Sequence, residues 1–401
     1  MGNAYDNASL IVTPNAYKAS KIYALKPTDG SGDLSFSRAG SKMVRNSSGL
    51  WETIGTNIPP LSYPVGGGCP SWLFEAEATN ELLHSGDFAQ SAWNKNLITV
   101  TSDQTQSPFI GVLADDILFT ASTGFFTQAK SSINGASKTV VASFFIKNKD
   151  FLTNETIKLR MSDGVVGPIE VNYKPFNNTY TTAAAASWTN TSFDVKDEGN
   201  GWYRVILVGT TSQWTNGWVE LSTASATRSL YVSNIQIELG AYATSSIITT
   251  SAAVTRLADI STTTGISALI GQTEGTLFID LIGTYDRQAI SKTAIALTGG
   301  ATNIRLDFYS GSFNLIALGI DVGAAFTSGQ QYKVAIVYNG TSLRWFINGS
   351  LCNSYTVTPS TFSAISLGNI ADVNQPNTTI KDVILYKTAL SDSEAIELTT
   401  L

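Results

Sequence analysis

The chain has 401 residues, of which 43% are hydrophobic, 10% aromatic and only 14% charged, and its 25 basic and 31 acidic side chains leave a net charge of −6. This length predicts two or three domains, and the many core-forming side chains exclude a disordered chain. An acidic chain without a cluster of Lys or Arg argues against a nucleic-acid partner, and its apolar stretches are shorter than the roughly 18–20 residues of a membrane span. One histidine, His84, and two cysteines, Cys69 and Cys352, leave little material for a metal centre or a catalytic triad.

The first part of the chain, residues 1–80, is predicted to be an extended N-terminal arm. It contains a loop, Pro64–Pro70, whose glycines and prolines cannot continue a central strand. Its first nine residues have neither the basic nor the apolar region of a secretory signal peptide. We therefore expect a protein that is made in a cytoplasm without a signal peptide.

Beyond the arm, apolar and polar residues alternate with a period of two, which predicts β-strands. These segments are rich in Val, Ile, Thr, Phe and Tyr, which suit a pleated, half-buried surface. In chain order they are Thr139–Ile146, Trp202–Gly209, Ser229–Glu238, Gly275–Ile282, Ile304–Tyr309, Tyr332–Tyr338 and Ser342–Asn348. One short helix is predicted at the end, over Leu390–Leu398, where Ser391 and Glu394 have the spacing of a capping box.

A tract rich in Ser, Thr and Ala, Thr244–Thr264, divides these strands into two groups and has the composition of a linker. We therefore predict an arm over residues 1–80, a middle domain over 81–245, a linker over 246–264 and a C-terminal domain over 265–401. Each domain is long enough for a β-sandwich with its own core.

The C-terminal domain contains two hairpin signals in a row. The strands Tyr332–Tyr338 and Ser342–Ile347 are each followed by an Asn-Gly turn, at 339–340 and 348–349. Later parts of the series are Ile365–Asn369 and Ile380–Glu394. This series resembles the laminin-G-like, concanavalin A-like jelly rolls. The resemblance implies a jelly-roll sandwich.

The middle domain carries a second set of motifs at its two ends. It opens with Asn80–Phe88 and Trp93, and it closes with Glu198–Gly201, Trp202–Val205 and Ser233–Gly240. These segments resemble the ends of carbohydrate-binding-module jelly rolls in phage structural proteins. The fold class is thus expected to be all-β, with two antiparallel jelly-roll β-sandwiches in tandem preceded by an extended N-terminal arm.

Segments on both sides of the middle domain extend this second resemblance. They are Phe36–Ala39, Trp51, Leu73–Asn80, Tyr242–Ile247 and Val254–Arg256. The whole series is similar to that of tailed-bacteriophage virion proteins. It implies a virion surface protein that is made in the host cytoplasm and contacts other virion proteins through its arm. Analogy with phage fibres also implies a homo-oligomer, a trimer.

Three tryptophans are candidates for sugar binding, because sugar rings stack on exposed aromatic faces. Trp214 and Trp218 bracket a predicted turn, and Trp188 is flanked by polar residues. The alternative for each is a place in the core, where large aromatic side chains are common.

Two acidic residues, Glu75 and Glu77, have a spacing that on one strand places both carboxylates on the same face. Their separation there would suit an inverting glycosidase, so a polysaccharide depolymerase is one alternative function. The resemblance makes this segment a structural connector instead, and we expect no enzyme activity.

Calcium is the ion that the resemblance implies, because such jelly rolls often hold one through oxygen ligands. In the middle domain it points to Asp87, Asn234 and Glu238, and the alternative is that these residues are solvated and bind no metal. Two arginines, Arg38 and Arg256, are either anchors of the arm and linker on neighbouring carboxylates or solvated surface residues.

These observations favour a virion structural protein, of the fibre or decoration type, that binds host surface glycans non-covalently. The second alternative is a purely structural virion component without a ligand.

Overall fold

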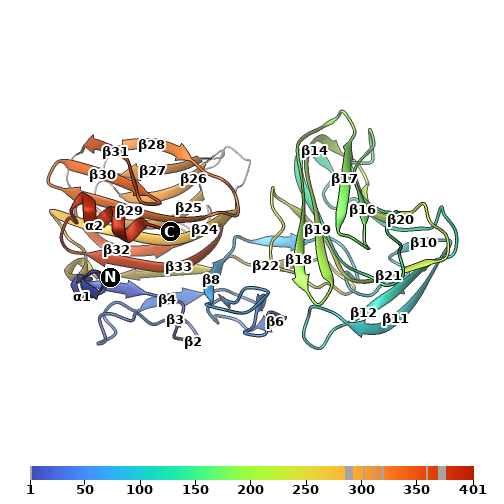
Figure 1. The fold of residues 1–401 in the computed structure, drawn as a ribbon, viewed down its shortest axis with the longest axis horizontal. Helices are drawn as coiled ribbons and strands as arrows, with labels where there is room; N and C mark the ends of the chain where they lie inside the picture. The colour runs from blue at the N-terminus through green and yellow to red at the C-terminus, as the bar shows by residue number, and fades with distance from the viewer. Residues whose placement is uncertain are drawn as a thin grey trace.

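Four large antiparallel β-sheets, stacked in pairs, form the two lobes seen in Figure 1. The structure is a computed structural model, and it describes residues 2–284, 292–300, 303–309, 312–317, 320–357, 360–368 and 376–401. The alternation of apolar and polar residues builds these sheets, because it directs one face of each strand into a core. The prediction of an all-β fold with two sandwiches in tandem is confirmed.

The C-terminal sandwich consists of an eight-stranded and a nine-stranded sheet. The eight-stranded sheet runs in the order β31-β30-β29-β24-β33-β8-β7, with β1 also paired to β33. Its strands are β1 (Leu10–Val12), β7 (Leu61–Ser62), β8 (Ser71–Phe74), β24 (Glu274–Thr284), β29 (Gln331–Asn339), β30 (Ser342–Ile347), β31 (Ser350–Thr356) and β33 (Asn377–Tyr386). The nine-stranded sheet runs in the order β2-β3-β4-β23-β32-β25-β26-β27-β28. Its strands are β2 (Tyr17–Lys18), β3 (Lys21–Ile22), β4 (Leu34–Ser37), β23 (Ile260–Thr264), β25 (Lys292–Gly299), β26 (Ile304–Tyr309), β27 (Ser312–Ala317), β28 (Ile320–Ala325) and β32 (Phe362–Leu367).

Residues of the predicted arm are built into this C-terminal sandwich. β1 and β8 pair with β33 near the end of the chain, and β4 pairs with β23, which lies within the predicted linker. Leu10, Phe36 and Trp72 are buried in the core that the two sheets share. The first 80 residues therefore do not extend away from the domains, because their apolar strands complete both sheets.

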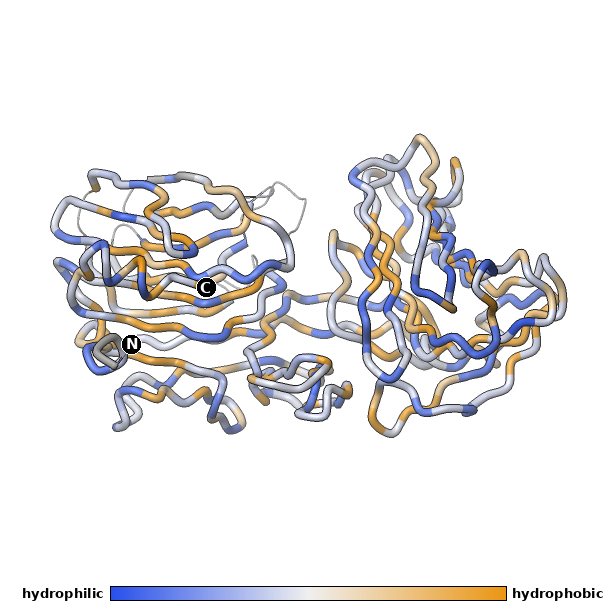
Figure 2. The backbone as a smooth tube through the Cα atoms, in the orientation of Figure 1, coloured by the Kyte–Doolittle hydropathy of each residue, from blue (hydrophilic) through white to orange (hydrophobic). Residues whose placement is uncertain are grey.

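The middle sandwich consists of two six-stranded sheets, named here after their strands β20 and β19. The β20 sheet runs in the order β10-β13-β20-β15-β16-β17, and the β19 sheet in the order β11-β12-β21-β14-β19-β18. The strands of the β20 sheet are β10 (Asn94–Asn96), β13 (Phe125–Lys130), β15 (Ile157–Ser162), β16 (Pro168–Lys174), β17 (Thr179–Ala184) and β20 (Gly217–Thr223). Those of the β19 sheet are β11 (Ile98–Gln106), β12 (Leu113–Phe119), β14 (Gly135–Asn148), β18 (Trp188–Gly199), β19 (Trp202–Trp214) and β21 (Arg228–Leu239). Figure 2 shows how the hydrophobic segments of each lobe follow its strands.

Two short strand pairs connect the lobes. They are β5 (Lys42–Arg45) with β6 (Trp51–Ile54), and β9 (Ala78–Asn80) with β22 (Val254–Arg256). The β5–β6 hairpin packs against the middle sandwich, since Trp51 shares a hydrophobic cluster with Phe145 and Trp202. β22 lies between the lobes in Figure 1.

Helices are few and short. α2 (Asp392–Thr399) begins after Ser391, whose side chain accepts a hydrogen bond from the Glu394 backbone, so the predicted capping box is confirmed. The others are α1 (Gly2–Asn7) and the 3-10 turn η1 (Ser267–Leu269). None of the helices in the described residues has the length and apolarity of a transmembrane helix.

Candidate functional site

Two of the three tryptophans predicted to stack on sugars lie in the core of the middle sandwich. Trp214 is completely buried and Trp188 is 5% exposed, and their rings meet edge to face with centroids 6.4 Å apart. Their indole N–H groups donate to backbone carbonyls, from Trp214 to Lys130 at 2.9 Å and from Trp188 to Gly167 at 2.8 Å. The prediction of a sugar platform is therefore wrong for Trp188 and Trp214, because neither ring offers a face to solvent.

The third tryptophan, Trp218, lies beyond a turn and on the other sheet. Trp214 ends β19, and the turn at Asn216, whose φ is +49°, carries the chain across to β20. In β20 the side chain of Val219 points into the core, so Trp218 and Glu220 point to the outer face, where both are half-buried. Trp218 is thus the predicted tryptophan that reaches solvent.

A charged triad lies beside Trp218 on this outer face of the β20 sheet. The strand register places Arg160 of β15 opposite both Glu220 of β20 and Glu170 of β16. The guanidinium of Arg160 lies 3.0 Å from each carboxylate, and Asn172 also donates to Glu170 at 3.0 Å. The side chains of Arg160, Glu170 and Glu220 are 27%, 18% and 13% exposed, so the triad is held in place while part of it still meets solvent.

A second aromatic side chain, Phe125 of β13, lies at the far end of the same face. Phe125 is half-buried and pairs with Ser222, four residues along β20 from Trp218. At about 3.3 Å per residue the two aromatic positions are about 13 Å apart along the strand direction. Glu220 lies between these two positions along β20, and Arg160 and Glu170 extend the triad from it across β15 and β16, on the side away from β13.

The electrostatics of the triad favour the ionised form of Glu170. Partial burial raises the pKa of Glu170, but hydrogen bonds from Asn172 and Arg160 outweigh this and lower the pKa below its usual value. Ionised carboxylates and a guanidinium offer fixed hydrogen-bond acceptors and donors. Together with aromatic faces, such groups can recognise a neutral polyhydroxylated ligand.

Glu238 and Asp87, two of the predicted calcium ligands, accept hydrogen bonds through their carboxylates, whereas the side-chain oxygen of Asn234 is buried without a hydrogen-bond partner in the part of the chain that the structure describes. Glu238 is buried and accepts two hydrogen bonds from Thr244, and the Asn234 amide donates to Ser246 at 2.5 Å. Asp87 accepts hydrogen bonds from Ala89 and Gln90. Within the described residues, no group of three or more His, Cys, Asp or Glu side chains could hold a metal ion. Calcium binding stays a prediction.

The loop that follows Asp87 already surrounds a cation of the protein itself. The ammonium group of Lys95 lies 2.6–3.1 Å from four backbone carbonyl oxygens, those of Phe88, Ala89, Gln90 and Trp93. Carbonyl oxygens of this kind are the ligands that Ca²⁺ prefers. In this loop those four carbonyl oxygens accept hydrogen bonds from the lysine side chain.

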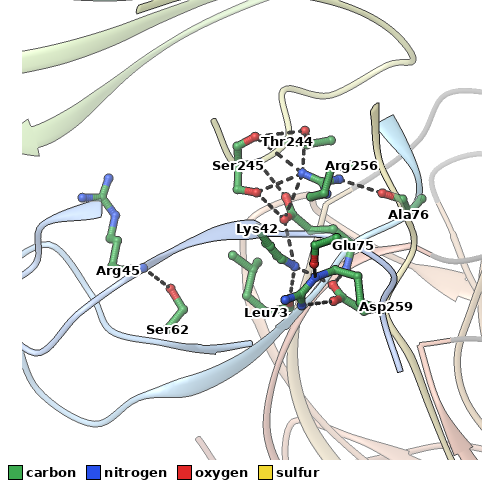
Figure 3. Close-up of polar contacts among 12 residues, drawn as sticks. Lys42, Arg45, Ser62, Leu73, Glu75, Ala76, Thr244, Ser245, Arg256 and Asp259 are labelled. Atoms are coloured by element: carbon green, nitrogen blue, oxygen red, sulfur yellow. Dashed lines mark hydrogen bonds and ion pairs between the residues drawn. The ribbon is translucent and has the colours of Figure 1, made fainter. Parts of the chain in front are cut away.

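The proposed catalytic pair, Glu75 and Glu77, is divided between interior and surface. Glu75 is 1% exposed and belongs to a buried ion cluster, drawn in Figure 3, whereas Glu77 is exposed. The carboxylate of Glu75 lies 2.9 Å from Lys42 and 3.3 Å from Arg256. Burial raises the pKa of Glu75, but Arg256 and Lys42 outweigh it and lower the pKa to about 2. A carboxylate that buried cations hold in its ionised form, and that is closed to solvent, cannot serve as a catalytic acid or reach a substrate as a nucleophile.

The same cluster confirms the hypothesis that two arginines anchor the arm and linker. Arg38 lies 2.9 Å from Asp259, and Arg256 pairs with Glu75. Lys42 lies between the two carboxylates, 2.5 Å from Asp259. Arg38 and Arg256 are buried, at 1% and 3% exposure, rather than solvated.

Comparisons with known proteins add a family match for one domain. Residues 271–395 match the family described as the Concanavalin A-like lectin/glucanases superfamily. The C-terminal sandwich is a concanavalin A-like domain. The match begins at residue 271, so the strands that residues 1–80 contribute to the concanavalin A-like domain lie outside it. A comparison with curated proteins found no match.

Solved structures are similar to about a third of the chain. One is the CBM40 module of the Ruminococcus gnavus IT-sialidase bound to alpha2,3 sialyllactose, with 18% identity, a TM-score of 0.28, and 33% of this chain and 84% of that chain covered. Another is the receptor-binding domain of the botulinum neurotoxin C/D mosaic serotype, with 16% identity, a TM-score of 0.29, and 35% and 40% covered. A third comes from work on the entry of botulinum neurotoxin type C and its two ganglioside molecules, with 13% identity, a TM-score of 0.30, and 35% and 39% covered. The alignment thus spans well under two thirds of the toxin chains.

In the concanavalin A-like domain, two carboxylates that are far apart in sequence become neighbours. Asp280 of β24 pairs across the sheet with Asp382 of β33, and Gln331 donates to both oxygens of Asp280 at 2.9 Å. Asp382 also lines a cavity of 720 Å³ between this sheet, the Pro64–Pro70 loop and the β5–β6 hairpin. Burial and the neighbouring Asp280 raise the pKa of Asp382 to about 6. From the sequence Asp280 is alone in its strand, because the pairing of β24 with β33 cannot be read from it.

The triad on the β20 sheet was likewise missed by the sequence analysis. Arg160, Glu170 and Glu220 are up to 60 residues apart, and each is an ordinary polar position of an alternating strand. Only the register of three strands brings them together. The sequence does show that apolar and polar residues alternate along each strand, and this pattern predicts that the three residues share the solvent face of their strands.

Proposed function

We propose that this protein binds glycans non-covalently through the outer face of the β20 sheet. The observation that carries the proposal is the group of side chains on that face, in which Trp218 and Phe125 lie on either side of Glu220 along the strands and Arg160 and Glu170 complete the charged triad. Aromatic faces exclude water from the apolar face of a sugar ring, and the fixed charges hydrogen-bond its hydroxyl groups. The triad is organised before a ligand arrives, which lowers the entropic cost of binding.

The position of this face also supports glycan binding. The β20 sheet lies on the side of the middle sandwich away from the concanavalin A-like domain (Figure 1), so a long surface polysaccharide can lie across it. Further support is the concanavalin A-like domain itself, since that superfamily is described as containing lectins. The charge balance of −6 suits neutral sugars better than strongly acidic ones.

A glycan array with the intact protein tests this proposal. We expect Trp218→Ala to weaken binding of the selected glycan at least tenfold, which corresponds to about 1.4 kcal/mol. Arg160→Met, which keeps the length of the side chain and removes its charge, should weaken binding by a similar factor. The control Tyr309→Ala removes an aromatic side chain that is 39% exposed from the other sandwich and should bind like the wild type. No binding by the wild type would leave the purely structural alternative.

We further propose that the protein is a surface component of a tailed-bacteriophage virion, of the fibre or decoration type. Support comes from the arm and linker motifs quoted above, whose charged residues Arg38, Glu75 and Arg256 hold the buried cluster between the sandwiches. Such a protein is made in the host cytoplasm and contacts other virion proteins. Mass spectrometry of purified particles, with cross-linking to identify neighbours, tests this assignment. Absence from the particles would overturn it.

The depolymerase alternative finds no support at Glu75, which is buried and ion-paired. Incubation of the protein with host capsule or cell-wall polysaccharide should release no reducing ends. Release that Glu77→Gln abolishes would contradict this expectation.

A further inference from the structure

The last strand of the β20 sheet, β17 (Thr179–Ala184), has an open edge. It pairs with β16 through six residues without any register shift, and none of the described strands lies on its other side. All six of its residues are exposed. Half of its backbone N–H and C=O groups therefore point away from β16, toward the position of another strand.

This edge lacks the features by which proteins prevent two edges from pairing. The sequence from Asn177 to Phe193 contains no charged residue and no proline, and β17 contains no bulge. The other strands that end one of the four large described sheets are protected by charges, register shifts or a length of two or three residues. They are β18 with Asp194 and Lys196, β28 with Asp321, β11 and β31 with a register shift, and the short β2, β7 and β10.

The partner that fits this edge is a second copy of the chain. A strand that captures foreign peptides needs pockets for their alternate side chains, and the fully exposed faces of β17 offer none. A neutral edge is also the place where two copies, each with a charge of −6, can meet without repulsion. Exposed apolar side chains at the end of the hairpin, Phe176 (55%) and Tyr180 (41%), add surface that pairing would cover.

We propose that β17 pairs antiparallel with β17 of a second copy, which joins the two β20 sheets into one continuous sheet. Antiparallel pairing about a two-fold axis perpendicular to the sheet places side chains of the same face opposite each other. The two outer faces then lie side by side and point in the same direction. If those faces bind glycans, as proposed above, the dimer binds a dense glycan surface through two sites at once.

Sedimentation equilibrium of the full chain tests the dimer. We expect the wild type to reach twice the 42.8 kDa of one copy as its concentration rises through the micromolar range. Thr182→Lys places like charges near the two-fold axis, and Thr182→Pro removes a backbone donor that points away from β16, toward the proposed partner strand. Each should weaken dimerisation at least tenfold. The control Ser354→Lys introduces the same charge on β31, an exposed edge of the concanavalin A-like domain, and should dimerise like the wild type.

Three results would overturn the proposal. They are a wild type that stays monomeric at every concentration, a trimer, and a dimer that Ser354→Lys disrupts as strongly as Thr182→Lys. Near-ultraviolet circular dichroism shows whether Thr182→Lys is folded. If it is not, the test uses Thr182→Pro and Tyr180→Glu instead. Glycan binding is read separately. A dimer without glycan affinity would contradict the proposed function alone, and a monomer that binds glycans would contradict this inference alone.

Discussion

Among single residues, Asp382 is a carboxyl group whose ionisation the fold opposes. Its neighbour across the strands is Asp280, so two carboxylates share one part of the sheet. Burial is the larger cause and Asp280 the second cause of a pKa of about 6, and Lys333 and Lys381 offset them only in part. Because the usual value is 3.8, the folded protein binds a proton at Asp382 at a pH where the unfolded chain has lost it.

This difference predicts how the stability depends on pH. The contribution of Asp382 is fully present below about pH 4 and is lost as the pH rises through about 6. Asp382→Asn removes this pH dependence, because asparagine cannot ionise. The free energy of unfolding of the variant minus that of the wild type should therefore be about 2 kcal/mol larger at pH 8 than at pH 4. Urea unfolding at the two pH values measures the gain. Asp194→Asn, at a side chain that is 58% exposed, is the control and should show no such gain. If this difference in unfolding free energy instead grew as the pH fell, the raised pKa of Asp382 would be contradicted.

The tryptophans show how far residue identity alone can locate a site. Trp214 and Trp218 are four positions apart, and on one strand they would share a face. The turn at Asn216 instead moves the chain from the β19 sheet to the β20 sheet, so one ring enters the core and the other faces solvent. The sequence shows the turn but not which sheet each flanking strand joins.

At the scale of strands, local alternation was sufficient and pairing was not predictable. The predicted segments Thr139–Ile146, Trp202–Gly209 and Ser229–Glu238 lie within β14, β19 and β21, because the period-two pattern is a local property. By contrast, the pairing of β1 with β33 joins residues such as Ile11 and Ile384, which no local pattern connects. For this reason the sequence alone indicates an arm over residues 1–80.

These pairings predict that the concanavalin A-like domain requires the N-terminal residues in order to fold. Residues 265–401 alone would lose β1, β8 and β4, and with them the core side chains Leu10, Phe36 and Trp72. Each large apolar side chain buried there contributes about 1.5–3 kcal/mol, and a small domain has about 5–15 kcal/mol in total. The fragment should therefore show no cooperative thermal transition by circular dichroism, whereas the intact chain should show one. A cooperative transition of the fragment alone would contradict this prediction.

At the scale of the whole molecule, two contacts fix the sandwiches to each other. In one, Arg45 of β5 and the indole N–H of Trp51 of β6 both bind Glu198 of β18. The other is the buried cluster in Figure 3, where Ser245, directly after the middle sandwich, donates two hydrogen bonds of 2.6 Å to Glu75. The Ser/Thr-rich tract thus acts as a packed connection rather than a flexible linker, because its hydroxyl groups satisfy buried charges.

The buried cluster predicts that Glu75 controls both stability and the arrangement of the two sandwiches. Glu75→Gln leaves Lys42 and Arg256 buried with one carboxylate fewer, and loss of one partner of a buried pair costs about 3–5 kcal/mol. We expect a lower midpoint of urea unfolding at pH 7 and a larger radius of gyration by small-angle X-ray scattering. Glu77→Gln is the matched control, since Glu77 is exposed two residues away.

The acid behaviour of the same variant separates this cluster from an ordinary packing defect. The pKa of Glu75 is about 2 in the folded protein against a usual 4.5, so its contribution is present above about pH 4.5 and is lost as the pH falls toward 2. The difference in unfolding free energy between wild type and Glu75→Gln should therefore shrink over that interval, because the wild-type carboxylate becomes protonated. A defect in packing alone would keep the difference constant with pH. A constant difference, or an equal effect of Glu77→Gln, would show that the ionised Glu75 does not hold the two sandwiches together.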